Sequence, residues 1–200
     1  PMPSVITGNT NVCLGSTTML TDSVSGGTWT SSNPLVAPVD VTGAVFGLSL
    51  GTATIFYTLP AGCTRSILVH VYPLPLVFGV TGGGSYCAGG SGVHIGLTGS
   101  SVGVNYMLYR YGVAATGAFE GTGGVLDFGL QTVAGPYTVI GTSTATTCSS
   151  AMAGSATIIV TPTLTPSVTV NAVPGDTVCS GTSVTYSPGR GNGGRAPGYQ

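Results

Sequence analysis

The stretch Asn11-Val-Cys-Leu-Gly-Ser16 has two counterparts further along the chain, Ser85-Tyr-Cys-Ala-Gly-Gly90 and Thr177-Val-Cys-Ser-Gly-Thr182. Each of the three follows a proline-containing segment and a short apolar run. They lie roughly 70 to 90 residues apart, a period that indicates an array of domains rather than a short solenoid repeat. We therefore predict one module at residues 1–73, a second at 74–162, and an incomplete third at 163–200.

The segments between the turns have the composition of β-strands. Five of them are rich in β-branched and aromatic residues and are bounded by Gly, Asn or Pro, namely 52–57, 67–71, 105–109, 136–140 and 156–160. Gly or Pro interrupts nearly every window that is long enough for a helix. Short strands at a spacing of roughly ten residues predict an all-β fold of tandem β-sandwiches.

The chain carries very little charge. Only 4% of its residues are charged, whereas a typical soluble domain has about 25%. Four basic residues and a net charge of −1 are too few for the phosphate contacts that nucleic-acid binding requires, so we expect no nucleic-acid partner. No run of about 18 apolar residues occurs, and we predict no membrane span. Solubility must therefore come from hydroxyl groups, exposed backbone, attached sugar or assembly.

The five cysteines are widely separated, at positions 13, 63, 87, 148 and 179. Their spacing lacks the closely spaced pairs that hold zinc. Well-separated cysteines in a chain without lysine are typical of an oxidising, extracellular setting. One bridge in each predicted module gives Cys13–Cys63 and Cys87–Cys148, each worth about 4 kcal/mol by chain entropy. Cys179 then remains unpaired or links to another chain.

Three stretches of the first module form a recognisable pattern: Gly26-Gly-Thr-Trp-Thr-Ser-Ser-Asn-Pro-Leu-Val36, Gly43-Ala-Val45 and Gly51-Thr-Ala-Thr-Ile55. Together they resemble the bacterial Ig-like domain family that occurs in invasin- and intimin-type surface proteins. The resemblance implies an Ig-like sandwich. We expect Trp29, the sole tryptophan, to be a core anchor of this sandwich.

The second module has a similar but looser pattern, from Ser85-Tyr-Cys87 through Tyr106-Met-Leu-Tyr-Arg-Tyr-Gly112 to Ala134-Gly-Pro-Tyr-Thr-Val139. It resembles Ig-like repeats in very large secreted adhesins of the Bacteroidota. This resemblance implies an extracellular or cell-surface location. The chain begins at Pro1 and shows no signal peptide, so we expect a processed chain or a piece of a longer one.

No motif in the chain predicts catalysis. Gly99-Ser-Ser-Val-Gly103 fits the G-x-S-x-G pattern, but that motif acts in a strand-turn-helix context that the sequence does not predict. The acidic residues are scattered over separate modules and suggest neither an acid–base pair nor a calcium site. Gly82-Gly-Gly84 is followed by neither a helix nor a lysine, which indicates a turn rather than a phosphate loop. We expect His70 and His94 to be ordinary strand residues, and we predict no catalytic residue, metal site or cofactor.

Two kinds of binding or modification site remain. Asp22-Ser23-Val24 and Asp176-Thr177-Val178 resemble the O-glycosylation signal of secreted Bacteroidota proteins, which makes Ser23 and Thr177 candidates; the alternative is an ordinary Asx-turn. Tyr109 and Tyr111 alternate along one predicted strand and would share a face that can stack on a sugar. Tyr106 and Tyr137 are further candidates, and the alternative for all four is packing in or over the sandwich.

The sequence as a whole predicts an extracellular structural protein, a non-catalytic array of Ig-like modules that forms a stalk or a self-assembling fibre. Residues 163–200 could donate strands to a sheet edge of the next copy, which would give head-to-tail association. One alternative is an adhesin module that binds a carbohydrate or a host ligand. Another is a set of accessory domains from a secreted hydrolase.

Overall fold

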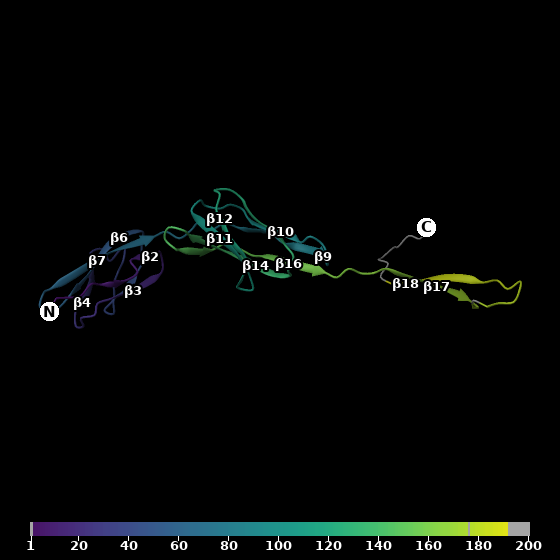
Figure 1. Cartoon of the computed structure of the whole chain (residues 1–200), viewed down its shortest axis with the longest axis horizontal. Helices are drawn as coiled ribbons and strands as arrows, with labels where there is room; N and C mark the ends of the chain where they lie inside the picture. Colours follow the sequence, from purple (N-terminus) through teal and green to yellow (C-terminus); the bar gives the residue numbers. More distant parts are fainter. Residues whose placement is uncertain (1, 176, 192–200) are drawn as a thin grey trace.

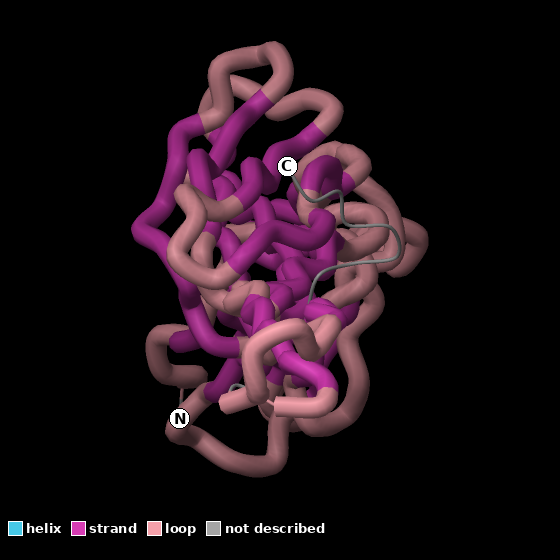
Figure 2. Tube along the Cα trace, turned by 90° about the vertical axis from the view of Figure 1, so that its right-hand side faces the viewer, coloured by secondary structure: helices cyan, strands magenta, loops and turns pink. Residues whose placement is uncertain are grey.

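The computed structural model describes residues 2–175 and 177–191, and the regular structure of this part is entirely β-sheet. This confirms the all-β prediction. Strands β1–β7, β8–β16 and β17–β18 follow one another along the longest axis of the molecule (Figure 1), and a view turned by 90° shows strands and loops throughout (Figure 2). None of the described residues belongs to a helix that could cross a membrane.

Strands β1–β7 form the N-terminal sandwich. One sheet has the order β1-β3-β5, with β1 at Thr7–Gly8, β3 at Thr17–Thr21 and β5 at Ala44–Phe46. The other has the order β2-β7-β6-β4, with β2 at Asn11–Cys13, β7 at Thr64–Tyr72, β6 at Gly51–Thr58 and β4 at Thr28–Ser31. Their inward-facing residues make one core: Ile6, Val12, Leu20, Ala37, Val45, Ala53, Ile55, Tyr57, Leu59, Val69 and Val71.

Trp29 lies at the margin of this core. It is half-buried, packs against the core cluster, and its ring centroid lies 4.6 Å from that of Tyr57. The Tyr57 hydroxyl in turn donates a hydrogen bond to the Val24 carbonyl. Since Trp29 is the only tryptophan, its fluorescence reports on the N-terminal sandwich alone.

Strands β8–β16 form the central sandwich. One sheet has the order β8-β10-β13, with β8 at Val80–Gly82, β10 at Val93–Leu97 and β13 at Leu126–Gln131. The other has the order β9-β16-β14-β11-β12, with β9 at Gly84–Cys87, β16 at Ala156–Thr161, β14 at Gly135–Ser143, β11 at Val104–Arg110 and β12 at Val113–Glu120; β15, at Ser149–Ala151, also pairs with β14. The core consists of Ile95, Leu97, Val104, Tyr106, Leu108, Leu126, Phe128, Tyr137, Val139, Met152, Ala156 and Ile158.

The two sandwiches have the same plan. In each, the first strand segment pairs antiparallel in one sheet (β1 with β3, β8 with β10), and the next segment pairs parallel with the last strand of the other sheet (β2 with β7, β9 with β16). The chain therefore changes sheets between the two segments. In the central sandwich this change falls at Gly82, Gly83 and Gly84, which all have positive φ, as the predicted turn requires. The two cores share no residue.

The C-terminal hairpin consists of β17 at Ser167–Val173 and β18 at Thr185–Gly191, paired antiparallel. The hairpin lies within the predicted third module, and like β1 and β3 in the first sandwich its two strands flank a cysteine, Cys179. Val168, Val170 and Tyr186 lie on one face of this two-stranded ribbon and are all exposed. The remainder of the predicted third module, at 192–200, lies outside the described residues.

Candidate functional site

The disulfide in the described part joins the two sandwiches to each other. Cys13 in the N-terminal sandwich bonds Cys148 in the central one, with their Cα atoms 5.5 Å apart. The predicted pairing within modules is therefore wrong, because Cys63 and Cys87 are free. Cys179, which the sequence analysis left over, is also free in the described structure.

The strand geometry explains why the predicted bridges cannot form. Cys13 ends β2 and stands beside Tyr72, the last residue of β7, because these strands run parallel. Cys63 immediately precedes β7, at the opposite end of the same strand. Nine residues of strand separate those ends by about 30 Å, whereas a disulfide needs Cα atoms within about 7 Å.

The central sandwich repeats this geometry. Cys87 ends β9 and stands beside Thr161, the last residue of β16, whereas Cys148 lies in the loop that follows β14. The two cysteines are again at opposite ends of their sandwich. The loop of Cys148 faces the preceding sandwich, where it meets Cys13. The bond therefore closes the junction between two sandwiches instead of bracing either one.

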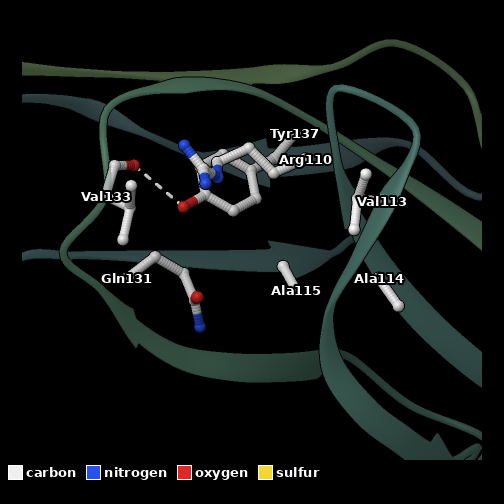
Figure 3. A pocket seen from close by; sticks show the side chains of 7 residues that line it. All are labelled: Arg110, Val113, Ala114, Ala115, Gln131, Val133 and Tyr137. Carbon is white, nitrogen blue, oxygen red and sulfur yellow. Dashed lines mark hydrogen bonds between the residues drawn. The ribbon is translucent and has the colours of Figure 1, made fainter.

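Besides the disulfide, a second candidate functional site is an open pocket of about 230 Å³ beside the β11–β12 hairpin (Figure 3). It is lined by Arg110, Val113, Ala114, Ala115, Gln131, Val133 and Tyr137. The Arg110 guanidinium donates a hydrogen bond to the Ala134 carbonyl at 3.1 Å, and the Tyr137 hydroxyl donates one to the Val133 carbonyl at 2.8 Å. Burial raises the pKa of Tyr137, although the Arg110 charge acts in the opposite direction, so this hydroxyl stays protonated. The pocket offers one cation and one amide to a ligand.

The tyrosines predicted to stack on a sugar do not share one strand face. Strand β11 ends at Arg110, and Tyr111 with Gly112 forms the two-residue turn to β12, with φ values of 50° and 77°. The predicted alternation of Tyr109 and Tyr111 is therefore wrong, because the chain reverses at Tyr111. Tyr109 is half-buried, and Tyr111 is 71% exposed with the Arg110 guanidinium 5.8 Å from its ring centroid. Stacking of a sugar on Tyr111 stays a prediction.

The other two tyrosine candidates are core residues. Tyr106 is fully buried, and its hydroxyl accepts a hydrogen bond from the Ser101 N–H. Tyr137 is 1% exposed. Neither ring presents a face to a sugar, so both follow the alternative interpretation of packing inside the sandwich.

The two candidate glycosylation sites are exposed. Ser23 follows Asp22, whose Oδ1 accepts a hydrogen bond from the Val24 N–H at 2.8 Å, which is the Asx-turn considered as the alternative. Such a turn leaves the Ser23 side chain free to carry a sugar, so the glycosylation of Ser23 stays a prediction. Thr177 is exposed as well, while the Asp176 of its motif lies outside the described residues.

Asp22 and Asp40 act as acceptors that organise turns of the N-terminal sandwich. Desolvation tends to raise the pKa of Asp22, but hydrogen bonds from the Val24 N–H and from Ser4, together with the Arg65 charge, hold it below 3.8. The Thr42 hydroxyl and the N–H groups of Ala44 and Thr42 likewise lower the pKa of Asp40. Both groups therefore stabilise the fold as carboxylates.

The lowered pKa values of Asp22 and Asp40 predict that acid selectively destabilises the N-terminal sandwich. A carboxyl with a lowered pKa in the folded state contributes stability above its unfolded pKa, and this stability is lost as the pH falls below about 4. Urea unfolding followed by Trp29 fluorescence should show a falling midpoint between pH 5 and pH 3. The double variant D22N/D40N should show a flatter dependence over the same range. An equally steep dependence in that variant would contradict the assignment.

The other sequence motifs form no reactive centre in the described part. The G-x-S-x-G stretch lies in the loop between β10 and β11, where the Ser100 hydroxyl donates to the Gly124 carbonyl. His94 makes an exposed pair with Asp127, with 2.8 Å between Nδ1 and Oδ2, and His70 stacks on Tyr72. Among residues 2–175 and 177–191, no group of three or more His, Cys, Asp or Glu side chains could hold a metal ion.

Comparison with known proteins gives one family and several structures of low similarity. Residues 2–63 match the family described as bacterial Ig-like domain (group 2). Murine CEACAM1b shares 12% identity over 78% of this chain and 98% of that one, with a TM-score of 0.39. Domains 4 and 5 of the S-layer protein SbsC share 16% identity over 82% of this chain and all of that one, with a TM-score of 0.36. No curated protein matches the chain.

Proposed function

We propose that this chain is a load-bearing spacer in a bacterial surface protein, in which linked Ig-like sandwiches hold a fixed orientation and extend away from the cell. The match of residues 2–63 to a bacterial Ig-like family supports a surface protein built from such modules. The two sandwiches of common plan support an array whose units differ in detail and not in role. A non-catalytic role is in keeping with both observations.

The observation that carries this proposal is the bond between Cys13 and Cys148. A disulfide within one sandwich would constrain only the chain of that sandwich. A bond across the junction instead restricts the motion of one sandwich against the other, which benefits a protein whose task is to keep its shape. Such a bond persists in an oxidising compartment, in keeping with an extracellular or cell-surface location.

The linker between the sandwiches also favours limited motion. It contains Pro73 and Pro75, whose rings restrict the backbone, and it spans only the few residues between β7 and β8. The covalent path along the chain and the disulfide thus connect the same two sandwich ends. Two separate connections remove rotations that either one alone would permit.

Residual dipolar couplings test the proposal. In the oxidised protein, couplings from the two sandwiches should fit one common alignment tensor, because they tumble as one body. In the variant C148S, they should require two tensors of different magnitude. Each sandwich keeps its own core in C148S, so both should give native spectra. A single tensor in both proteins would show that the bond does not set the orientation, and two tensors in the oxidised protein would overturn the proposed function.

Self-association of this array into a fibre stays a finer proposal. The exposed apolar face of the C-terminal hairpin supports it, because a two-stranded ribbon with Val168, Val170 and Tyr186 uncovered gains stability when a further sheet packs on it. A head-to-tail contact through this hairpin would extend the same spacer without new chemistry.

A further inference from the structure

The free cysteines occupy positions that are equivalent to the two bonded ones. Cys13 and Cys87 each end the second strand segment of a sandwich and stand beside the last residue of the parallel final strand. The residue after each cysteine donates its N–H to the carbonyl of that same final residue, Leu14 to Tyr72 and Ala88 to Thr161. Cys87 therefore has the position in the central sandwich that Cys13 has in the N-terminal one.

The turn after these cysteines is also the same. The Ser16 N–H donates to the Cys13 carbonyl, and the Gly90 N–H donates to the Cys87 carbonyl, both at 2.9 Å. The Thr182 N–H donates to the Cys179 carbonyl at 3.1 Å. In all three turns the second residue after the cysteine is a glycine with positive φ: Gly15, Gly89 and Gly181. Cys179 is thus a third cysteine of the Cys13 type.

Cys63 matches the other partner of the bond. Cys148 lies in the loop between β14 and β15, and its carbonyl accepts a hydrogen bond from the Ser143 N–H at 2.8 Å. Cys63 lies in the corresponding loop between β6 and β7, and its carbonyl accepts one from the Leu59 N–H at 2.9 Å. Each cysteine immediately precedes the next strand. Cys63 therefore occupies in the N-terminal sandwich the position of Cys148 in the central one.

From this equivalence we propose that Cys63 and Cys87 are complementary halves of further junction disulfides of the Cys13–Cys148 type, each formed with the abutting end of another sandwich of the same plan. Cys63 takes a Cys13-type cysteine from a sandwich that precedes it. Cys87 takes a Cys148-type cysteine from a sandwich that follows. Every junction of such an array would then carry one disulfide, and the bonds would always join unlike positions.

The proposal deepens the proposed function, since it names the partner of the spacer as another sandwich of its own kind. The chemistry is ordinary thiol–disulfide exchange with a small disulfide oxidant such as oxidised glutathione. One protein thiolate attacks the oxidant, which forms a mixed disulfide and releases one glutathione thiolate. The second protein thiolate attacks the protein sulfur of that mixed disulfide, which forms the junction bond and releases the second glutathione thiolate.

Cross-linking between copies of this chain tests the proposal, because one copy can supply the missing end to another. The full oxidised chain is held in a glutathione redox buffer, where disulfides exchange until the most stable ones prevail. Products are resolved on non-reducing gels, and the bonds are assigned by peptide mass spectrometry. We expect Cys63 of one copy to be joined to Cys87 or Cys179 of another. In the variant C63S, the yield of these oligomers should fall at least tenfold.

Exposure alone predicts the opposite result, which makes the test sharp. Cys87 and Cys179 are exposed, whereas Cys63 is partly buried. Indiscriminate oxidation would therefore join Cys87 to Cys179 and leave Cys63 reduced. That outcome, or the absence of any cross-link, would overturn the proposal. The variants C87S and C179S are the matched controls, since each should lose only its own bond to Cys63. Either outcome leaves the dipolar-coupling test intact, so the two proposals fail independently.

Discussion

Loss of the Cys13–Cys148 bond should lengthen the fully stretched protein by about 440–480 Å. The bond spans a sequence separation of 135 residues, and an extended chain adds about 3.3–3.6 Å per residue. When the oxidised protein is pulled from its two ends, the disulfide transmits the force directly from Cys13 to Cys148. The chain between these cysteines lies outside the load path and cannot be drawn out. Optical-tweezers extension of wild type and C148S measures the difference directly.

The load path predicts which strands yield first. In the oxidised protein only β1 and β2 on one side, and β15, β16 and the C-terminal hairpin on the other, are pulled. Most strands of both sandwiches are protected, so the oxidised trace should lack the full unfolding steps of the two domains. The variant C63S removes a thiol without removing a bond, and its trace should coincide with that of wild type. Equal final lengths for wild type and C148S would contradict the bond.

Local patterns predicted the strands but not the cysteine pairing. Alternation places Ala53, Ile55 and Tyr57 on one face of a strand, and all three are core residues. The position of Cys13 depends instead on a parallel contact between β2 and β7, which are far apart in sequence. No local signal specifies which ends of a sandwich two cysteines occupy. The three cysteine turns did carry the information that Cys13, Cys87 and Cys179 are equivalent, and equivalent positions at the same sandwich end do not pair within one sandwich.

The tyrosine prediction failed for a local reason. Alternation from Tyr109 to Tyr111 assumes that the strand continues, but Tyr111 and Gly112 both take positive φ and reverse the chain. Glycine is favoured at the second position of such a turn, so Gly112 was the residue from which the turn could have been predicted. A tyrosine at the first position is unusual, and strand composition on both sides concealed the turn. The pocket beside this hairpin was missed for the same reason, since it exists only after β12 folds back.

A second large effect is expected from Gly82→Ala in the central sandwich. A Cβ at this position would lie 2.1 Å from the His94 carbonyl oxygen, and Gly82 has a φ of 87°. The obstructing atom belongs to the backbone of β10, which pairs with β8 at this point and also accepts a hydrogen bond from the Gly83 N–H. To make room, a strand must shift, which disturbs the β8–β10 pairing and the Gly83 hydrogen bond. We expect a loss of about 3 kcal/mol or more and a fall in Tm of at least about 12 °C for this sandwich.

Gly112→Ala is the matched control, because Gly112 has a φ of 77° and a Cβ there would meet nothing within 4 Å. It bears only the backbone cost of a left-handed alanine, about 1 kcal/mol. Calorimetry of both variants therefore separates the close approach of two strands from the glycine conformation itself. Trp29 fluorescence should report an unchanged N-terminal sandwich in both, since the two cores share no residue. If Gly82→Ala and Gly112→Ala lower the Tm equally, Gly82 is required only for its φ value, and the close approach of β8 to β10 adds no constraint there.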